Sequence, residues 1–348
     1  MDMELNRRPR AMGAQSIVGV VSLASCVQAA ALQAGCDALR ALSGWQVAVS
    51  PAALECESDF AGSAACRARS LMEMWQRDDV NAIVCSRGGY GSNYLLPLLD
   101  FDALRKTPKI LVGYSDNTSL LLALDRAGMV AFHGPMVASD FATGRVDEYS
   151  WRAALGGDAL DFDFPAASNS SNAKPMGVQP LTHGEAAAPI VGGCLSVVVA
   201  SLGTPWEVNA AGKILFLEDV NEKAFRTDRM LMQLLLAGKL SGVRGIIFGA
   251  MKGCGAASAE EESLPQMIRR ILGGLGIPIV IGFPSGHVDA GNITLPFGVP
   301  AVLSSTEAGV RLRVEAATLI RVQNKIQDEN RSASPLAQGT SEINDTNQ

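Results

Sequence analysis

The sequence predicts an α/β protein, with a parallel, doubly wound sheet in its N-terminal half and a second unit of strands and helices in its C-terminal half. Between Ser16 and Arg126, short apolar runs alternate with helical segments, which is typical of a parallel, doubly wound sheet. The polar stretch Ser168–Asn172 interrupts this alternation, and apolar strands resume beyond it. Of the 348 residues, 48% are hydrophobic, enough to form the cores of two ordinary domains.

The N-terminal half begins with a basic leader, residues 1–14, which we expect to be flexible. The predicted strands are 16–23, 45–49, 82–85 and 110–112, and the predicted helices are 27–42, 64–77, 95–104 and 116–126. We place this domain at residues 15–160. Ligands of such sheets bind beyond the carboxyl ends of the strands, so the loops after 82–85 and 110–112 are the places to look for a site.

The C-terminal half is expected to follow a linker or surface loop at residues 161–183 and to span residues 184–322. Its predicted strands are 214–217, 245–248, 279–281 and 310–314, and its predicted helices are 195–202 and 227–237. Residues 323–348 are rich in Asn, Ser, Gln and charged side chains, so we expect a disordered tail.

Composition excludes several classes of protein. A net charge of −6 provides no basic surface for nucleic acid, and no apolar run reaches the length of a membrane span. The seven cysteines are scattered and form no C-x-x-C pair, which favours reduced thiols in the cytoplasm over a disulfide framework or a zinc ribbon. The sequence has no H-E-x-x-H, Walker or G-x-G-x-x-G motif, so we expect neither a metal nor a cofactor.

The N-terminus leaves one alternative open. Leu23-Ala-Ser-Cys26 resembles a lipoprotein cleavage site, which would make the protein a non-catalytic, ligand-binding lipoprotein anchored at Cys26. The apolar run before it is short and broken by Gly19 and Ser22, and a buried strand followed by an Ala-rich helix is what an α/β domain needs first. We therefore favour a strand.

Two glycine-containing turns follow predicted strands. Gly113-Tyr-Ser-Asp-Asn117 places Ser115 between a strand and a helix, as in a nucleophile elbow, although Asn117 stands where the G-x-S-x-G pattern has glycine. A plain helix N-cap explains the same residues. Ser86-Arg-Gly-Gly-Tyr-Gly-Ser92 has bare backbone N–H groups that suit an oxyanion hole, or is an ordinary tight turn.

A catalytic serine needs a base, and the chain has only three histidines, His133, His183 and His287. His287 follows the apolar strand 279–281, where sites form. Glu218 and Asp219 directly follow another apolar run, and an acid there can orient an imidazole or simply cap a turn. Cys194 has no visible activating partner, so we interpret it as a buried residue at a helix start.

Taken together, these segments resemble the LD-carboxypeptidases, a serine-peptidase family that includes the microcin C immunity peptidases. The resemblance covers about residues 15 to 320 and rests on motifs that occur in one order. They are Arg87-Gly-Gly-Tyr-Gly91, Gly113-Tyr-Ser-Asp116, Phe132-His-Gly-Pro135, Gly192-Gly193, Leu217-Glu-Asp219, Arg226-x-Asp228-Arg229, Gly282-Phe-Pro284 with Gly286-His287, and Leu295-Pro296.

The resemblance implies a Rossmann-like parallel-sheet N-terminal domain and a smaller, β-rich α/β C-terminal domain. It implies a triad in which Ser115 is the nucleophile, His287 the general base and Glu218 the residue that orients the histidine. It implies an oxyanion hole of backbone N–H groups at Gly88, Gly89 and Asp116. Candidate substrate contacts are Arg87, Tyr90 and Arg226. Cys194 and the segment Val288–Gly291 depart from the expected pattern and bear on substrate identity.

The implied activity is hydrolysis of the L,D-peptide bond to the terminal D-Ala of muropeptide tetrapeptides. The implied setting is peptidoglycan recycling in the cytoplasm, by a homodimer that acts on a muropeptide or other small peptide and binds neither nucleic acid nor membrane. A microcin C immunity-like peptidase that cleaves peptidyl-nucleotide conjugates is the alternative. An aromatic residue placed to stack on adenine, for which Trp206 is a candidate, would favour it.

Overall fold

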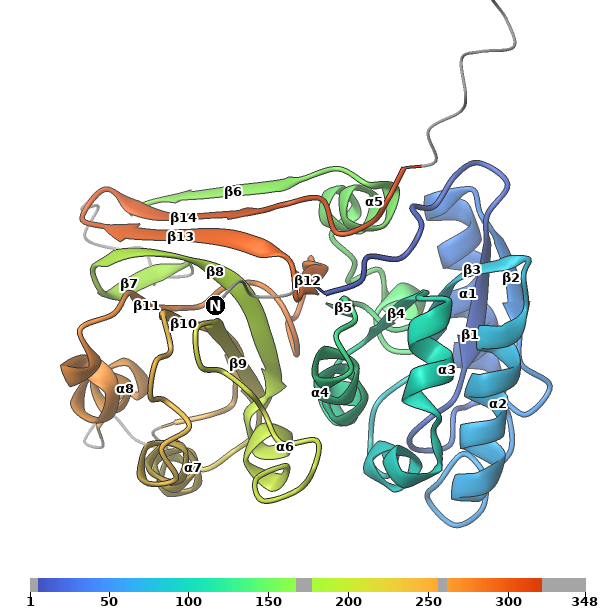
Figure 1. Ribbon diagram of the computed structural model, residues 1–348, viewed down its shortest axis with the longest axis horizontal. Coiled ribbons are helices and arrows are strands. Elements are labelled where there is room, and N and C mark those ends of the chain that lie inside the picture. Colours follow the sequence, from blue (N-terminus) through green and yellow to red (C-terminus); the bar gives the residue numbers. More distant parts are fainter. Residues whose placement is uncertain (1–5, 167–176, 256–261, 321–348) are drawn as a thin grey trace, which may run out of the picture.

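Two β-sheets, one built mainly from each half of the chain, organise the computed structural model, which describes residues 6–166, 177–255 and 262–320 (Figure 1). The N-terminal sheet has the strand order β12-β5-β4-β3-β1-β2. Its strands are β1 (Ile17–Val21), β2 (Gln46–Val49), β3 (Val80–Cys85), β4 (Ile110–Gly113), β5 (Ala131–His133) and β12 (Leu295–Phe297). Strands β1 to β5 are parallel, while β12 comes from the other half of the chain and pairs antiparallel with β5. The prediction of a Rossmann-like N-terminal domain is confirmed.

Helices connect these parallel strands and cover the sheet. They are α1 (Ala29–Ser43), α2 (Ala64–Gln76), α3 (Phe101–Lys106), α4 (Thr118–Arg126) and α5 (Glu148–Gly156). The single helix predicted over 95–104 is wrong, because this segment forms a 3-10 helix, η1 (Ser92–Leu98), followed by α3. Pro97 lacks the N–H that a continuous helix needs, and the Asp100 side chain accepts from the backbone N–H of Ala103 to start a new one.

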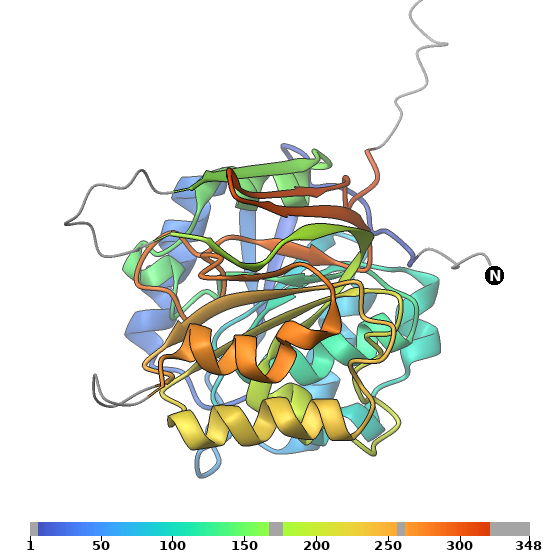
Figure 2. The same ribbon diagram turned by 90° about the vertical axis from the view of Figure 1, so that its left-hand side faces the viewer.

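The C-terminal sheet is curled and has the strand order β6-β14-β13-β8-β9-β10-β11-β7. Its strands are β6 (Leu160–Pro165), β7 (Gln179–Thr182), β8 (Gly184–Cys194), β9 (Ile214–Val220), β10 (Gly245–Lys252), β11 (Ile279–Ile281), β13 (Pro300–Thr306) and β14 (Gly309–Val314). Strands β8 to β11 are parallel, and the remaining pairings are antiparallel. Helix α6 (Leu195–Ala200) follows β8, and Figure 2 shows α7 (Ala224–Leu236) and α8 (Leu264–Leu272) side by side on the outside of this sheet. The predicted β-rich α/β character of this half is confirmed.

Two segments expected to be irregular are ordered. The predicted linker 161–183 contributes most of β6 and all of β7, the two edge strands of the C-terminal sheet, although Ser168–Asn172 lies outside the described residues, as does the predicted tail. Residues 6–14 of the leader pack against the rest of the chain, where other segments accept some of their backbone donors. Arg7 N–H donates to Gly128 O (2.8 Å) and Met12 N–H donates to Leu155 O (2.8 Å).

The cysteines differ from the expectation of seven reduced thiols. Cys26 and Cys56 form a disulfide across a sequence separation of 30, and Cys36, Cys66, Cys85, Cys194 and Cys254 are free. The loop after β1 and the loop before α2 lie side by side, with Cys26 N–H donating to Asp59 O (3.1 Å). Spacing alone does not reveal such a tertiary contact.

The same region decides the question at the N-terminus. Strand β1 lies between β2 and β3, and its residues Val18, Val20 and Val21 are completely buried. The segment before Cys26 is therefore a core strand, as favoured above, and the sulfur of Cys26 is joined to Cys56 rather than available as an anchor. Among the described helices, none is long and apolar enough to cross a membrane.

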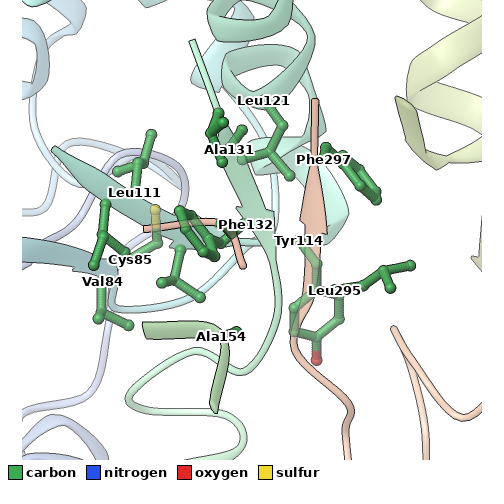
Figure 3. Packing of buried hydrophobic residues seen from close by; sticks show 14 of the residues in the cluster. Val84, Cys85, Leu111, Tyr114, Leu121, Ala131, Phe132, Ala154, Leu295 and Phe297 are labelled. Atoms are coloured by element: carbon green, nitrogen blue, oxygen red, sulfur yellow. The ribbon is translucent and has the colours of Figure 1, made fainter. Parts of the chain in front are cut away.

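One hydrophobic cluster joins the two halves at the β5–β12 edge. Figure 3 shows Leu295 and Phe297 of β12 beside Phe132 of β5 and Tyr114. All four side chains are buried, and full burial of each large apolar side chain contributes about 1.5–3 kcal/mol. This packing fixes the carboxyl ends of β4 and β5 against the segment that leads into β12.

Candidate active site

Ser115 occupies a strained turn at the carboxyl end of β4. Its φ is +60°, a region that non-glycine residues seldom adopt, and a short 3-10 helix, η2 (Ser115–Asn117), leads from it into α4. Such strain at a strand-to-helix turn is the geometry of a nucleophile elbow, which lifts the hydroxyl above the sheet. A helix N-cap with extended backbone, the plainer interpretation of the motif, does not require a positive φ.

The glycine turn after β3 packs directly on this serine. A Cβ at Gly88 would lie 2.9 Å from Ser115 Cβ, and Gly89 has a φ of +119°, so neither position accepts a side chain without strain. The Asn117 amide donates to Arg87 O (3.2 Å) and holds the turn in place. Within the described chain, the N–H groups of Gly88 and Gly89 have no acceptor, which leaves them available beside Ser115.

Asp116 joins the two turns. Its carboxylate accepts from the backbone N–H groups of Gly91 (3.2 Å) and Ser92 (2.8 Å), and the Ser92 hydroxyl donates to Asp116 O (2.6 Å). Burial raises the pKa of the Asp116 carboxyl, an effect that these hydrogen bonds only partly offset. The side chain of Asp116 thus fixes the glycine turn, while its backbone N–H belongs to the serine turn.

His287 and Glu218 form a close pair contributed by the C-terminal half. Glu218 is near the end of β9 and completely buried, and its Oε2 lies 2.6 Å from His287 Nδ1 and 3.2 Å from His287 N. Gly286 allows this approach, since a Cβ there would lie 2.4 Å from Glu218 Oε2. The histidine keeps 19% of its side chain exposed, and Tyr114 packs against it with ring centroids 5.0 Å apart.

The pKa values of this pair follow from their contacts. Burial acts to raise the pKa of Glu218, but the neighbouring imidazoles of His133 and His287 outweigh it and lower the pKa from 4.5 to about 2. Burial acts to lower the pKa of His287, but the hydrogen bond and charge of Glu218 outweigh it and raise the pKa above 6.5. Glu218 is therefore an anion at neutral pH, and it stabilises the imidazolium form of His287.

Ser115 and His287 line one cavity of about 410 Å³, although they come from distant parts of the chain. Two arginines, Arg87 and Arg145, also line this cavity, and Arg87 donates to Cys26 O (3.1 Å). Arg145 donates to Ser139 O (2.9 Å) and lies 3.7 Å from the buried carboxylate of Asp140. The remaining lining residues are Val27, Gln28, Ala31, Gly88, Gly89, Tyr114, Met136, Ala138 and Ser139.

The other predicted substrate contacts lie elsewhere. Tyr90 is half exposed and lines a neighbouring cavity of about 420 Å³ together with Trp206. Arg226 forms an ion pair with Glu222 (2.8 Å) and is not among the residues that line these two cavities, so its role as a substrate contact stays a prediction. Sequence reasoning missed Arg145, and its position shortly after β5, at the same sheet edge as Ser115, was the available signal.

Within the described residues, neither a reactive thiol at Cys194 nor a metal-binding group of acidic side chains is found. Cys194 is buried at the start of α6, with its Sγ 3.4 Å from Asp219 Oδ1, and burial raises the pKa of the thiol. It is therefore a protonated, buried residue at a helix start, as predicted. Among the described residues, no group of three or more His, Cys, Asp or Glu side chains is placed to hold a metal ion.

Comparison with known proteins identifies the family. The LD-carboxypeptidase N-terminal domain matches residues 18–134, and the LD-carboxypeptidase C-terminal domain matches residues 187–303. The chain belongs to the LD-carboxypeptidase family. It is thus a serine-type carboxypeptidase, a hydrolase, and the resemblance drawn from its motifs is confirmed.

Several members of this LD-carboxypeptidase family are similar over most of their length. A putative carboxypeptidase of Streptomyces coelicolor is 39% identical over 86% of this chain and 93% of its own. A probable murein peptide carboxypeptidase of Bacillus subtilis is 34% identical over 87% of this chain and 93% of its own. The crystal structure of muramoyltetrapeptide carboxypeptidase from Oxalobacter formigenes superposes with a TM-score of 0.77 at 27% identity, covering 87% of this chain and all of that one. These matches make a non-catalytic lipoprotein untenable.

Proposed function

We propose that this enzyme removes the terminal D-Ala of muropeptide tetrapeptides with a triad of Ser115, His287 and Glu218. The observation that carries the proposal is the cavity that combines Ser115 and His287 with two arginines, Arg87 and Arg145. A serine and a histidine provide the hydrolytic chemistry, and the cations provide a place for the free carboxylate that distinguishes a carboxypeptidase substrate.

The triad divides the proton transfers in a defined way. Because His287 Nδ1 faces the carboxylate of Glu218, it carries the hydrogen, and Nε2 is left to accept the proton of Ser115. Ser115 attacks the carbonyl carbon of the scissile bond, and the protonated His287 then gives the proton to the departing amine of D-Ala. Water, deprotonated by the same nitrogen, hydrolyses the acyl-enzyme.

The oxyanion of the tetrahedral intermediate is assigned to backbone N–H groups at Gly88, Gly89 and Asp116. The two glycine N–H groups are without an acceptor in the described chain, and both glycines line the cavity of Ser115, with Gly88 packed directly on it. Removing one such donor typically costs about 3–4 kcal/mol of transition-state stabilisation.

The cavity also has side chains that suit the carboxylate and the methyl group of the departing D-Ala. Arg87 and Arg145 are assigned to the terminal carboxylate because both line the cavity beside Ser115 and His287. The apolar wall formed by Val27, Ala31 and Met136 suits the methyl group of D-Ala. Members named for murein peptides, including the murein tetrapeptide carboxypeptidase of Pseudomonas aeruginosa at 30% identity, support this substrate class.

Mass spectrometry of a muropeptide tetrapeptide incubated with wild-type protein and with Ser115→Ala tests the proposal. We expect wild type to release one D-Ala, and the variant, with an unchanged circular dichroism spectrum, to lose activity on the order of a million-fold. Turnover by a clean Ser115→Ala preparation would refute the triad.

A peptidyl-nucleotide substrate is the second candidate, because Trp206 and Tyr90 line the cavity that adjoins the first at Gly89. The microcin C7 self-immunity protein of Escherichia coli is 25% identical over 67% of this chain. The same pair of proteins, incubated with an aminoacyl sulfamoyl adenosine, separates the candidates. Cleavage of this compound, with the tetrapeptide left intact, would favour the second.

We also propose that the enzyme is a cytoplasmic homodimer, as the family resemblance implies. Light scattering coupled to gel filtration tests the dimer, and a monomeric mass would refute it. Cell fractionation with a reporter tests the location. The Cys26–Cys56 pair offers a further readout, since a reducing compartment would leave both thiols free to alkylation.

A further inference from the structure

Glu218 has a second histidine on its other side, which the triad does not use. His133, at the end of β5, is completely buried, and its Nε2 lies 3.8 Å from Glu218 Oε1. Neither of these two atoms has a hydrogen-bond partner in the described structure. The opposite oxygen, Oε2, is the one that receives His287. An unpartnered carboxylate oxygen and an unpartnered ring nitrogen facing each other away from water require an explanation.

The contacts of the other ring nitrogen decide where the hydrogens are. His133 Nδ1 lies 3.1 Å from Ser285 Oγ, and the Ser285 hydroxyl lies 2.8 Å from Ile293 O, which can only accept. If the hydroxyl hydrogen goes to Ile293 O, His133 Nδ1 must donate to Ser285. If it goes to His133 instead, Nδ1 accepts and the hydrogen of a neutral ring is on Nε2.

Only one arrangement leaves His133 Nε2 bare, a neutral ring with its hydrogen on Nδ1. That arrangement directs a lone pair at the carboxylate of Glu218 and leaves both atoms unsatisfied in a fully buried site, which costs about 1–3 kcal/mol or more for a charged group. Every other arrangement provides an N–H directed at Glu218 Oε1. The separation needs to shorten by only about 1 Å to give an ordinary hydrogen bond.

We infer that His133 carries a hydrogen on Nε2 and donates it to Glu218, so that the carboxylate is held between His287 and His133. This inference rests on the proposed triad. His133 is a positioning residue: it does not reach the substrate cavity, and it acts by fixing the carboxylate and sharing its charge. Its ring is itself fixed by Phe216 and Phe297, at centroid distances of 4.8 and 5.7 Å.

The hydrogen bond from His133 to Glu218 also affects the pKa of His287. A hydrogen bond from His133 reduces the negative charge that Glu218 directs at His287, and this keeps the pKa of His287 from rising further. Removing the donor therefore raises the pKa of His287 and moves the acid limb of kcat/KM to higher pH. The other titratable groups around this unit are Tyr114, Asp140, Arg145, Cys194 and Asp219, all of which are present in every variant compared.

The first test is ¹⁵N NMR of histidine-labelled Ser115→Ala protein, a spectrum with only three histidines to assign. We expect a protonated Nε2 on His133, with a coupling to its hydrogen that persists because the site is closed to water. A bare Nε2 with the hydrogen on Nδ1 would overturn the inference. Because this measurement needs no catalysis, it stands apart from the activity test of the triad.

The second test compares His133→Gln with His133→Asn. The Gln amide nitrogen extends to about the position of Nε2 and keeps a donor for Glu218, whereas the shorter Asn reaches only the position of Nδ1. We expect His133→Asn to lower kcat about 10- to 100-fold with little change in KM, and to shift the acid limb of kcat/KM to higher pH. We expect Gln to keep most of the activity and the wild-type pH profile. Equal losses in both variants, with unshifted pH profiles, would show that His133 is only a packing residue.

Discussion

Replacing Glu218 with Gln removes the charge on which His287 depends while keeping the shape of the side chain. Glu218 is fully buried and 2.6 Å from His287 Nδ1, so solvent does not replace what is lost. The protein lowers the pKa of Glu218 from 4.5 to about 2, which corresponds to about 3 kcal/mol of favourable interaction with its donors. An interaction of this size is worth on the order of 10²-fold in rate if it is lost in the transition state.

The amide has a further effect because it can present an N–H₂ group to His287 Nδ1. That contact favours the tautomer with hydrogen on Nε2, which cannot accept the proton of Ser115, and in a serine triad this error costs about 10⁴-fold. We therefore expect kcat of Glu218→Gln to fall by about 10²- to 10⁴-fold. The pKa of His287 should also fall, since burial then acts without the opposing carboxylate, and the acid limb of kcat/KM should move to lower pH.

The assay is D-Ala release from a muropeptide tetrapeptide, measured from pH 4 to pH 10 with a matched Asp219→Asn control. Asp219 is also buried, but it accepts from Ser196 N–H (2.8 Å) and Val220 N–H (2.8 Å) rather than from the histidine. We expect the Asp219→Asn control to be less stable than wild type. His287 should keep its hydrogen on Nδ1 in this control, and the control should keep most of its kcat. A Glu218→Gln enzyme with wild-type kcat and an unshifted acid limb would refute the reasoning.

Three further predictions concern the surroundings of the triad. Gly89→Ala should abolish most activity and destabilise the fold, because φ is +119° and the new Cβ would lie 2.3 Å from Ser25 Oγ. Thermal unfolding and activity assays check this prediction, and Gly156→Ala is the control because its new Cβ would have nothing within 4 Å. Arg145→Met should raise KM for the tetrapeptide about tenfold or more, and a substrate with an amidated C-terminus should show no such difference between the two enzymes. Reduction of Cys26–Cys56 should lower the free energy of unfolding by roughly 3–4 kcal/mol, and an unchanged melting temperature under dithiothreitol would contradict it.

Most of the N-terminal fold was predictable because its signals are local. The strands at 82–85 and 110–112 are short apolar runs, and Ser63, whose hydroxyl accepts from Cys66 N–H, marks the start of α2. The break between η1 and α3 was equally local, since Pro97 and Asp100 are visible in the sequence, and the prediction of one helix gave them too little weight. Strand β12 was not predictable, because its partner β5 lies more than 150 residues earlier in the chain.

The residues of the candidate site also fall into two groups, those with a local signal in the sequence and those that depend on tertiary packing. The glycine turn has a local signal because glycine accepts positive φ, and Ser115 has one because it lies between an apolar run and a predicted helix. The pairing of Glu218 with His287, and the presence of His133 behind it, depends on how two sheets pack, which no local pattern records. The Cys26–Cys56 disulfide was missed because only the tertiary fold brings its two loops together, whereas Arg145 was missed although its place in the segment after β5 was a signal. The role of Arg226 stays a prediction, because a charge in a motif does not show where its side chain points.

The two pKa shifts at the Glu218–His287 pair place maximal stability and maximal activity at different pH. The pKa of Glu218 is lowered, so its contribution to stability is complete above 4.5 and is lost as the pH falls toward about 2. The pKa of His287 is raised, so its contribution is complete below 6.5 and is lost as the pH rises through the elevated value. Both contributions are complete only between about pH 4.5 and 6.5, where His287 is protonated and cannot act as a base. We expect the melting temperature to be highest in this window and kcat/KM to be highest at a pH above it. In a Glu218→Gln variant, we expect this difference between the two pH optima to disappear. Coincident optima in the wild-type enzyme would mean that His287 is not the base.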